Sequence, residues 1–234
     1  VQLFSLLHAN PVFPTKSGLL DLLAEIMGNA PRLASYLSAN PALLDGVLVG
    51  GFLEPPPSAD EMAADLDQRL KEARDFEDVL EISRRFANDL RFRIGVQTLK
   101  GLIDVNVAGQ AVTDCAEVMV RRLLAEVGRI FEQAHGRVAG GAFAVMALGK
   151  LGGRELTERS DLDFVFVYDA APGAERSDGA RPLAVPEYFA RLSQRLISAL
   201  SAPTSEGTLF AVDMRLRPSG GSGPVRSEEH TSEL

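Results

Sequence analysis

Hydrophobic residues in the first 138 positions recur every three to four residues, which is the period of an amphipathic helix. Three consecutive prolines at 55–57 interrupt this pattern and predict an extended connector over residues 50–58. The region is therefore expected to be mostly helical, with short helices within 17–49 and longer helices over 60–80, 79–102 and 112–135.

Two local features of this helical region carry their own expectations. Asn29 and Asn40 are predicted helix N-caps, because a proline-containing first turn follows each of them. The arginines of the 79–102 helix are expected on a solvated face, with contact to a phosphate or an acidic partner as the alternative. These arginines are Arg84, Arg85, Arg91 and Arg93.

The pattern changes at Gly141 from helical to strand-like. An apolar strand with Phe143 and Val145 precedes a glycine-rich turn, and a second strand follows over 162–168. The second strand is apolar on both faces after its acidic start, which is typical of a central strand covered on both sides. A polar loop over 169–184, a helix over 186–203 and a third strand over 208–216 complete a predicted α+β arrangement.

Acidic residues mark two of the predicted strands. Asp161 and Asp163 are two residues apart and project to one side of their strand, an arrangement in which two carboxylates can share a divalent cation. Even positions of the third strand are apolar, and Asp213 lies on its other face. Because a carboxylate leaving a packed strand needs a partner, we expect Asp213 to join Asp161 and Asp163 around Mg²⁺.

Glycines at 149, 152 and 153 lie between the first two strands. They would let the backbone approach phosphates closely, and Lys150 would add positive charge. The spacing matches neither a Walker A motif nor a dinucleotide fingerprint. There are purely structural alternatives. The glycines could only form a turn, Asp161 could only cap a neighbouring backbone segment, and Asp213 could pair with Arg215 or Arg217. The combination of features favours phosphoryl transfer with Mg²⁺.

Composition narrows the classes of function. A net charge of −8 argues against a nucleic-acid partner, which would require a basic excess. Cys115 is the only cysteine, so an internal disulfide or a thiolate cluster is excluded and a cytoplasmic setting is expected. The three histidines lack zinc-peptidase spacing. No apolar stretch approaches the ~20 residues of a membrane span, so no membrane partner is expected.

Both ends of the sequence suggest a piece of a longer protein. Val1 stands within a helical pattern, and residues 226–234 break from the preceding pattern and resemble translated sequencing-adapter read-through. The expected segments are a helical lead-in over 1–54, the helical part of the module over 55–138, a core over 139–225 and an artefactual tail over 226–234.

The motifs GKLGGREL and SDLDFVFVYD, followed by FAVDMRLRPSGGSGPV, resemble the glutamine synthetase adenylyltransferase family. Members of this family attach AMP to a tyrosine of glutamine synthetase and also remove it, using two modules of the nucleotidyltransferase fold. The resemblance is densest over 147–225. It implies a nucleotidyltransferase-fold mixed sheet with flanking helices, ATP as substrate and Mg²⁺ as cofactor.

Carried over by position, the resemblance also implies roles for individual residues. Asp161 and Asp163 would bind Mg²⁺, and Asp213 would complete the site and help to activate the tyrosine hydroxyl. The triphosphate and the geometry of the site would be held by Gly149, Lys150, Gly152, Gly153, Ser160, Arg215 and Arg217.

The resemblance leaves the direction of the reaction open. The stretch over 17–48 and the motif RLRPSGGSGPV are more similar to the adenylylating module. The alternatives are the module that removes AMP by phosphorolysis, yielding ADP, and a non-catalytic module that binds a regulator. The implied partners are glutamine synthetase and a nitrogen-signalling regulatory protein. The family's sequence continues past Val225, so part of the substrate surface is expected to lie outside this chain.

Overall fold

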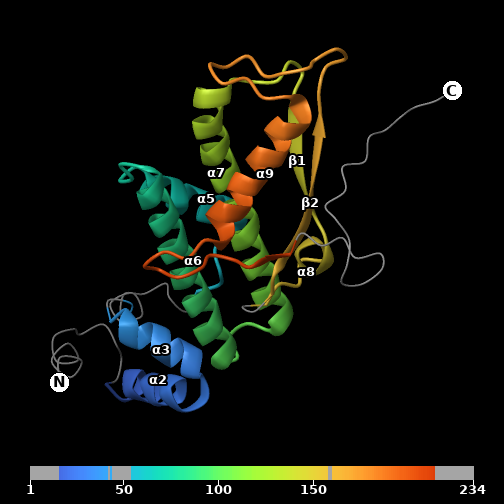
Figure 1. Cartoon of the computed structure of the whole chain (residues 1–234). Helices are drawn as coiled ribbons and strands as arrows, with labels where there is room; N and C mark the ends of the chain where they lie inside the picture. Colours follow the sequence, from blue (N-terminus) through green and yellow to red (C-terminus); the bar gives the residue numbers. More distant parts are fainter. Residues whose placement is uncertain (1–15, 42, 44–53, 158–159, 214–234) are drawn as a thin grey trace. The chain divides into compact units, whose positions relative to one another are not determined.

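The computed structural model describes residues 16–41, 43, 54–157 and 160–213 (Figure 1). The chain divides into two compact units, residues 1–118 and residues 119–234, and helix α7 (Val105–His135) runs from one into the other. Described strands occur only in the second unit, so the predicted α+β class is confirmed. No helix in the described ranges has the length and apolar character that a membrane span needs.

In the described part of the first unit, three helices are packed with helix α6 (Phe76–Leu99). Helix α2 (Lys16–Asn29) contacts α3 (Pro31–Ala39), and both share a buried core with α6; α5 (Ala59–Leu70) also contacts α6. Each fully buried large apolar side chain contributes about 1.5–3 kcal/mol. The buried residues of the α2, α3 and α6 core are Leu22, Ile26, Leu37, Phe92 and Val96.

Capping residues determine where α5 and α6 begin. The Ser58 hydroxyl accepts a hydrogen bond from the Glu61 amide, and the Glu61 carboxylate accepts one from the Ser58 amide at 2.8 Å, which forms a capping box. Asp75 accepts from the Asp78 amide at 2.9 Å and starts α6. The prediction of one helix over 60–80 is therefore wrong, because α5 ends at Leu70 and α6 begins at Phe76.

Two expectations about single residues of this unit are also corrected. Asn29 is the last residue of α2 and caps nothing that follows; Ala30 precedes α3. The Asn40 side chain donates to the Tyr36 carbonyl at 3.0 Å, so it closes the end of α3. The helix predicted after Asn40 falls largely outside the described residues.

The arginines of α6 do not share one solvated face. Arg84 is fully buried, and its Nη1 donates to the Leu80 carbonyl at 3.0 Å. Burial lowers the pKa of Arg84. Arg93 is half-buried and donates to the Glu54 carbonyl at 3.0 Å. Of the four arginines, only Arg85 is exposed.

The second unit contains a three-stranded mixed sheet in the order β1-β2-β3. Strand β1 (Ala142–Ala147) is antiparallel to β2 (Leu162–Asp169), and β2 is parallel to β3 (Val212–Asp213). Strand β2 is thus central, as predicted. The third strand begins at Val212 and not at 208, and residues 214–216 of its predicted range lie outside the described residues.

Helix α9 (Val185–Ser201) covers one face of this sheet, and the C-terminal part of α7 packs against α9 (Figure 1). The Phe189 ring stacks on Tyr168 with centroids 4.5 Å apart and on Phe143 at 5.8 Å. Phe131 of α7 meets Tyr188 edge-on at 4.9 Å. Aromatic contacts therefore hold the sheet and the two helices together.

The other face of the sheet is open within the described part of the chain. Met146 is 53% exposed and Val167 is 47% exposed. Leu162 and Phe164, whose side chains point to the opposite face of β2 from Val167, are buried. The prediction of a strand covered on both sides is therefore wrong. Because side chains two residues apart share a face, Val167 lies on the same side as Asp163.

Candidate active site

Two of the predicted site carboxylates lie on neighbouring strands. Asp163 of β2 is the register partner of Asp213 of β3, and the Leu162 amide donates to the Ala211 carbonyl at 2.8 Å. Paired strands are about 4.8 Å apart, and register partners point to the same face. The tertiary structure therefore places the side chains of Asp163 and Asp213 together on the open face of the sheet.

Asp161 immediately precedes β2. It is exposed, whereas Asp163 and Asp213 are half-buried. Since it is two residues before Asp163, extended backbone places it on the same side. Neither Asp161 nor Asp163 has an ion-pair partner among the described residues. A cation would offset the repulsion between these neighbouring negative charges.

Gly149 lies directly against the Asp163 carboxylate. Its φ is +51°, and a Cβ at this position would collide with Oδ2 of Asp163. The amide of Leu148 donates to the Asp163 carbonyl at 2.8 Å, which fixes the start of the turn beside the strand. Glycine is thus favoured here by the backbone angle, and a larger residue would also displace the Asp163 carboxylate.

The rest of the glycine segment forms a single helical turn, α8 (Gly149–Gly152). A Cβ at Gly152 would approach the Ala147 carbonyl oxygen to 2.9 Å, so Gly152 permits close packing of the turn on β1. Gly153 has only ordinary van der Waals contacts. Lys150 is exposed and has no ion-pair partner among the described residues. The lysine is therefore available to a ligand.

Ser160 lies just before β2. Its Oγ accepts a hydrogen bond from the Thr157 amide at 3.0 Å and lies 2.9 Å from Thr157 Oγ1. The hydroxyl therefore has a structural role in this structure. Arg215 and Arg217 lie outside the described residues.

Sequence reasoning missed Arg154, which follows the glycine pair. Its φ is +59°, the only positive φ of a non-glycine residue in the described part of the chain. It stands just after the C-cap Gly153 of α8, at a position where helices commonly end on a left-handed glycine. A helix of four residues is too short to be read from periodicity, so the position could not be identified from the sequence.

The described residues contain no group of three or more His, Cys, Asp or Glu side chains placed to hold a metal ion. The predicted three-carboxylate cluster is thus not assembled within the described ranges. The donors nevertheless suit Mg²⁺, because carboxylate oxygens are its preferred protein ligands and the strand register places two of them side by side.

The second unit thus places a pair of carboxylates beside a glycine turn on a mixed sheet. Sequence comparison identifies the family. Residues 20–231 match the family described as glutamate-ammonia ligase adenylyltransferase, and the chain belongs to this family. The resemblance expected from the motifs is confirmed.

Three relatives illustrate how much of the family's length this chain represents. The chain is similar to bifunctional glutamine synthetase adenylyltransferase/adenylyl-removing enzymes of Brucella suis (49% identity), Agrobacterium fabrum (48%) and Rhizobium meliloti (46%). Each match covers 96% of this chain and 22% of the relative. The chain therefore spans about a fifth of the length of these relatives.

Proposed function

We propose that this chain carries a nucleotidyltransferase-fold site that transfers AMP from ATP to a tyrosine hydroxyl of glutamine synthetase. The observation that supports it most directly is the register of β2 and β3, which pairs Asp163 with Asp213 while Gly149 lies against the Asp163 carboxylate. Membership of the adenylyltransferase family supports the same reaction. The central acidic strand next to a glycine turn supports the nucleotidyltransferase fold.

The carboxylates would hold Mg²⁺ and orient the attacking hydroxyl. When bound, Mg²⁺ would neutralise the negative charge of the triphosphate and stabilise the departing oxygen. Asp161, Asp163 and Asp213 would be its ligands. Asp213 would also accept a hydrogen bond from the tyrosine hydroxyl and help to remove its proton. The new bond forms between the tyrosine oxygen and the α-phosphorus of ATP, the bond from that phosphorus to the β-phosphate bridge breaks, and pyrophosphate leaves.

The glycine turn would hold the phosphates. Lys150 is exposed on this turn and would contribute its positive charge. Catalysis would then be mostly positional and electrostatic, since the groups are held by strands and a short turn rather than by long loops. The remaining proposed phosphate contacts are Gly149, Gly152, Gly153, Ser160, Arg215 and Arg217.

The same arrangement could also perform the opposite task of the family. In phosphorolysis, inorganic phosphate attacks the phosphorus of AMP-tyrosine, and ADP and the free tyrosine hydroxyl are released. The relatives are named for both activities. Incubating adenylylated glutamine synthetase with phosphate and measuring ADP separates this alternative from AMP transfer. We also propose that the full-length protein binds a nitrogen-signalling regulator and that it acts in the cytoplasm.

The direct test replaces one carboxylate while keeping the shape of the side chain. Asp161→Asn should abolish Mg²⁺-dependent transfer of labelled AMP to glutamine synthetase, because the site loses a charged ligand while the exposed position leaves folding intact. Asp169→Asn is the matched control. Asp169 carries the same charge at the far end of β2, and among the described residues its side chain accepts only from the adjacent Ala170 amide.

The two variants make the result interpretable. We expect the Asp169→Asn chain to transfer AMP at the rate of the parent chain. Full transfer by the Asp161→Asn chain, with circular dichroism showing that it is folded, would contradict the assignment of the site.

A further inference from the structure

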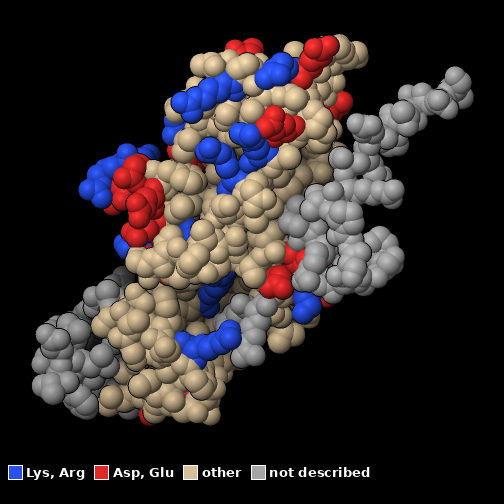
Figure 2. Space-filling view, viewed as in Figure 1, with Lys and Arg blue, Asp and Glu red and all other residues tan. Residues whose placement is uncertain are grey.

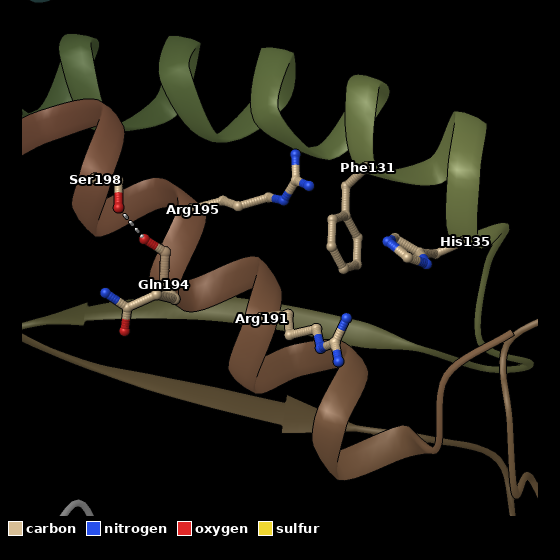
Figure 3. A pocket seen from close by; sticks show the side chains of 6 residues that line it. All are labelled: Phe131, His135, Arg191, Gln194, Arg195 and Ser198. Atoms are coloured by element: carbon tan, nitrogen blue, oxygen red, sulfur yellow. Dashed lines mark hydrogen bonds between the residues drawn. The ribbon is translucent and has the colours of Figure 1, made fainter. Parts of the chain in front are cut away.

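A groove lies between the C-terminal part of α7 and α9, within the second unit (Figure 3). Phe189, which stacks on the sheet, lies on a different side of α9. The groove therefore belongs to the side of α9 away from the strands and is separate from the open sheet face that bears Asp163. Its volume is about 240 Å³. The lining residues are Phe131, His135, Arg191, Gln194, Arg195 and Ser198.

The charge of the groove is positive. None of the six lining side chains is acidic. Both Arg191 and Arg195 point along the groove toward Phe131 and His135, whereas the Gln194 side chain points away (Figure 3). In Figure 2 several basic side chains gather over the region where α9 lies. A basic groove stands out on a chain whose net charge is −8.

Arg195 is the central cation of the groove. Its guanidinium lies 5.3 Å from the centroid of the Phe131 ring, and this cation–π contact holds it in place. It has no ion-pair partner among the described residues. Arg191, by contrast, pairs with Glu187 at 2.6 Å through side chains that are about half exposed. The N–H donors of Arg195 are therefore available to a ligand.

His135 forms the end of the groove with one ring nitrogen already engaged. Its Nδ1 lies 2.7 Å from the Arg181 carbonyl oxygen, and because a carbonyl only accepts, Nδ1 carries the hydrogen. The residue is 7% exposed, and its ring lies 4.4 Å from the Phe131 ring. The Nε2 atom is thus left for a second polar contact, in a fixed orientation.

We propose that this groove binds a small molecule carrying a carboxylate or phosphate group, with the oxyanion on Arg195, whose guanidinium lies over the Phe131 ring. The planar fork of a guanidinium matches the oxygens of both groups. The volume is below the about 300 Å³ at which pockets for drug-sized ligands begin, so the ligand is small. Arg191 and the Nε2 of His135 provide the remaining polar contacts.

The test titrates the whole chain with two probes by calorimetry. Sodium succinate and sodium phosphate are each added in Mg²⁺-free buffer, with ionic strength held constant by chloride. We expect saturable binding of at least one probe, and the probe that binds more tightly distinguishes a carboxylate site from a phosphate site. Arg195→Gln should weaken this binding by at least about tenfold, because a charge-assisted hydrogen bond is lost.

Arg129→Gln is the matched control for charge. Arg129 is on α7 in the same unit, pairs with Glu126 on the surface and does not line the groove, so its loss should leave binding unchanged. A second readout follows the ring signals of His135 by NMR, assigned with His135→Gln; these signals should shift as the probe is added. The Asp161→Asn chain should bind the probe as the parent does, so failure of the proposed active site would not affect this result.

Three outcomes would overturn the proposal. They are the absence of saturable binding by either probe, an equal loss of affinity in Arg129→Gln and Arg195→Gln, and binding that leaves the His135 signals in place.

Discussion

At the scale of single residues, the glycines of the 149–153 segment have different roles although the sequence presents them alike. Gly149 has a left-handed backbone and lies against the Asp163 carboxylate, while Gly153 could accommodate a side chain with ordinary contacts. Arg154 occupies the left-handed conformation that a glycine would adopt more easily. The requirement for glycine is therefore set by what lies next to each position.

Replacement of Gly149 by alanine tests this requirement. Gly149→Ala should destabilise the second unit by at least about 1–2 kcal/mol, because an L-residue is strained at this φ and its Cβ would displace the Asp163 carboxylate. AMP transfer should fall as well. Urea unfolding measures the free energy difference.

A glycine in helix α7 provides the control. Gly128 has open space around its Cβ position, so Gly128→Ala should raise the free energy of unfolding by about 0.5–1 kcal/mol through helix propensity. If Gly149→Ala were as stable as the parent chain, the close approach to Asp163 would be refuted.

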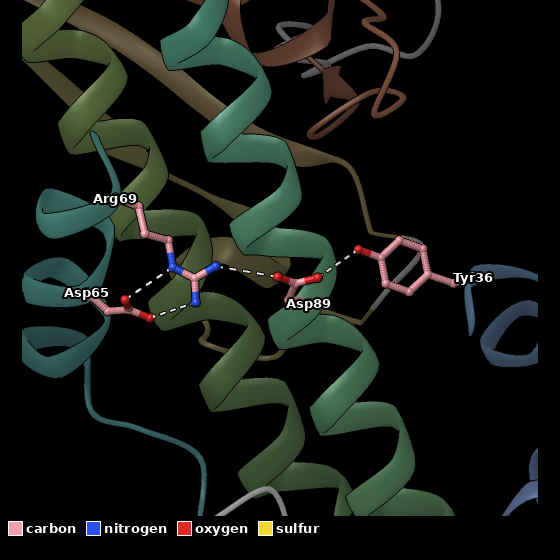
Figure 4. A network of polar contacts seen from close by, with 4 residues as sticks. All are labelled: Tyr36, Asp65, Arg69 and Asp89. Carbon is pink, nitrogen blue, oxygen red and sulfur yellow. Dashed lines mark hydrogen bonds and ion pairs between the residues drawn. The ribbon is translucent and has the colours of Figure 1, made fainter. Parts of the chain in front are cut away.

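At the scale of elements, a polar network joins three helices of the first unit (Figure 4). The Tyr36 hydroxyl of α3 donates to Asp89 of α6 at 3.0 Å. Arg69 of α5 contacts Asp89 at 3.4 Å and Asp65 at 3.0 Å. Burial raises the pKa of Asp89, and the hydrogen bond from Tyr36 and the charge of Arg69 oppose this rise. The network therefore helps to keep a half-buried carboxylate ionised at neutral pH.

The Tyr36→Phe substitution should reveal this balance through its pH dependence. At pH 7 it should lower the free energy of unfolding by about 1–2 kcal/mol, because the carboxylate of Asp89 loses a donor. The raised pKa means that folded Asp89 holds its proton more tightly than the unfolded chain does. The contribution of Asp89 to stability therefore falls as pH rises above about 3.9, which is the pKa of this carboxyl in the unfolded chain. The cost of Tyr36→Phe should accordingly shrink near pH 4, where Asp89 is protonated more often.

Denaturant titrations at pH 7 and pH 4 measure both effects. Tyr168→Phe is the control, since the described residues give the Tyr168 hydroxyl no hydrogen bond and its removal should change stability by less than about 0.5 kcal/mol at either pH. An equal cost of Tyr36→Phe at the two pH values would show that ionised Asp89 does not depend on this hydrogen bond.

At the scale of the whole molecule, the division into two units places the proposed site entirely in the second. The glycine turn and the carboxylates all follow residue 119, whereas the Tyr36–Asp89 network precedes it. Ligand binding to the proposed site is therefore expected to stabilise the second unit directly.

Calorimetric melting with and without Mg²⁺ and ATP tests this expectation. A ligand at 100 times its Kd stabilises the folded form by about 2.7 kcal/mol, so the transition of the second unit should move to higher temperature. Asp213→Asn should remove the shift, because it takes away one of the two register-paired carboxylates. Arg195→Gln, in the separate groove, should retain it. A shift that survives Asp213→Asn would place the nucleotide elsewhere.

Much of the fold followed from local patterns because those patterns depend on residues close in sequence. Helical periodicity predicted α6, α7 and α9, and apolar runs on either side of the glycine turn predicted β1 and β2. The pattern failed where short-range polar groups decided the outcome, as at Asp75, which begins α6 where a continuous helix was expected. It also failed for Arg84, whose burial depends on packing between elements.

By itself, the sequence determined the family, the α+β class and the identity of the candidate carboxylates, since spacing within one strand and one turn is a local property. The tertiary structure decided which strand lies beside which, and so the pairing of Asp163 with Asp213, fifty positions later in the chain. It also decided that one sheet face is open in the described residues and that His135 meets Arg191 and Arg195 in one groove. These features depend on contacts between distant segments, which no local pattern of residues specifies.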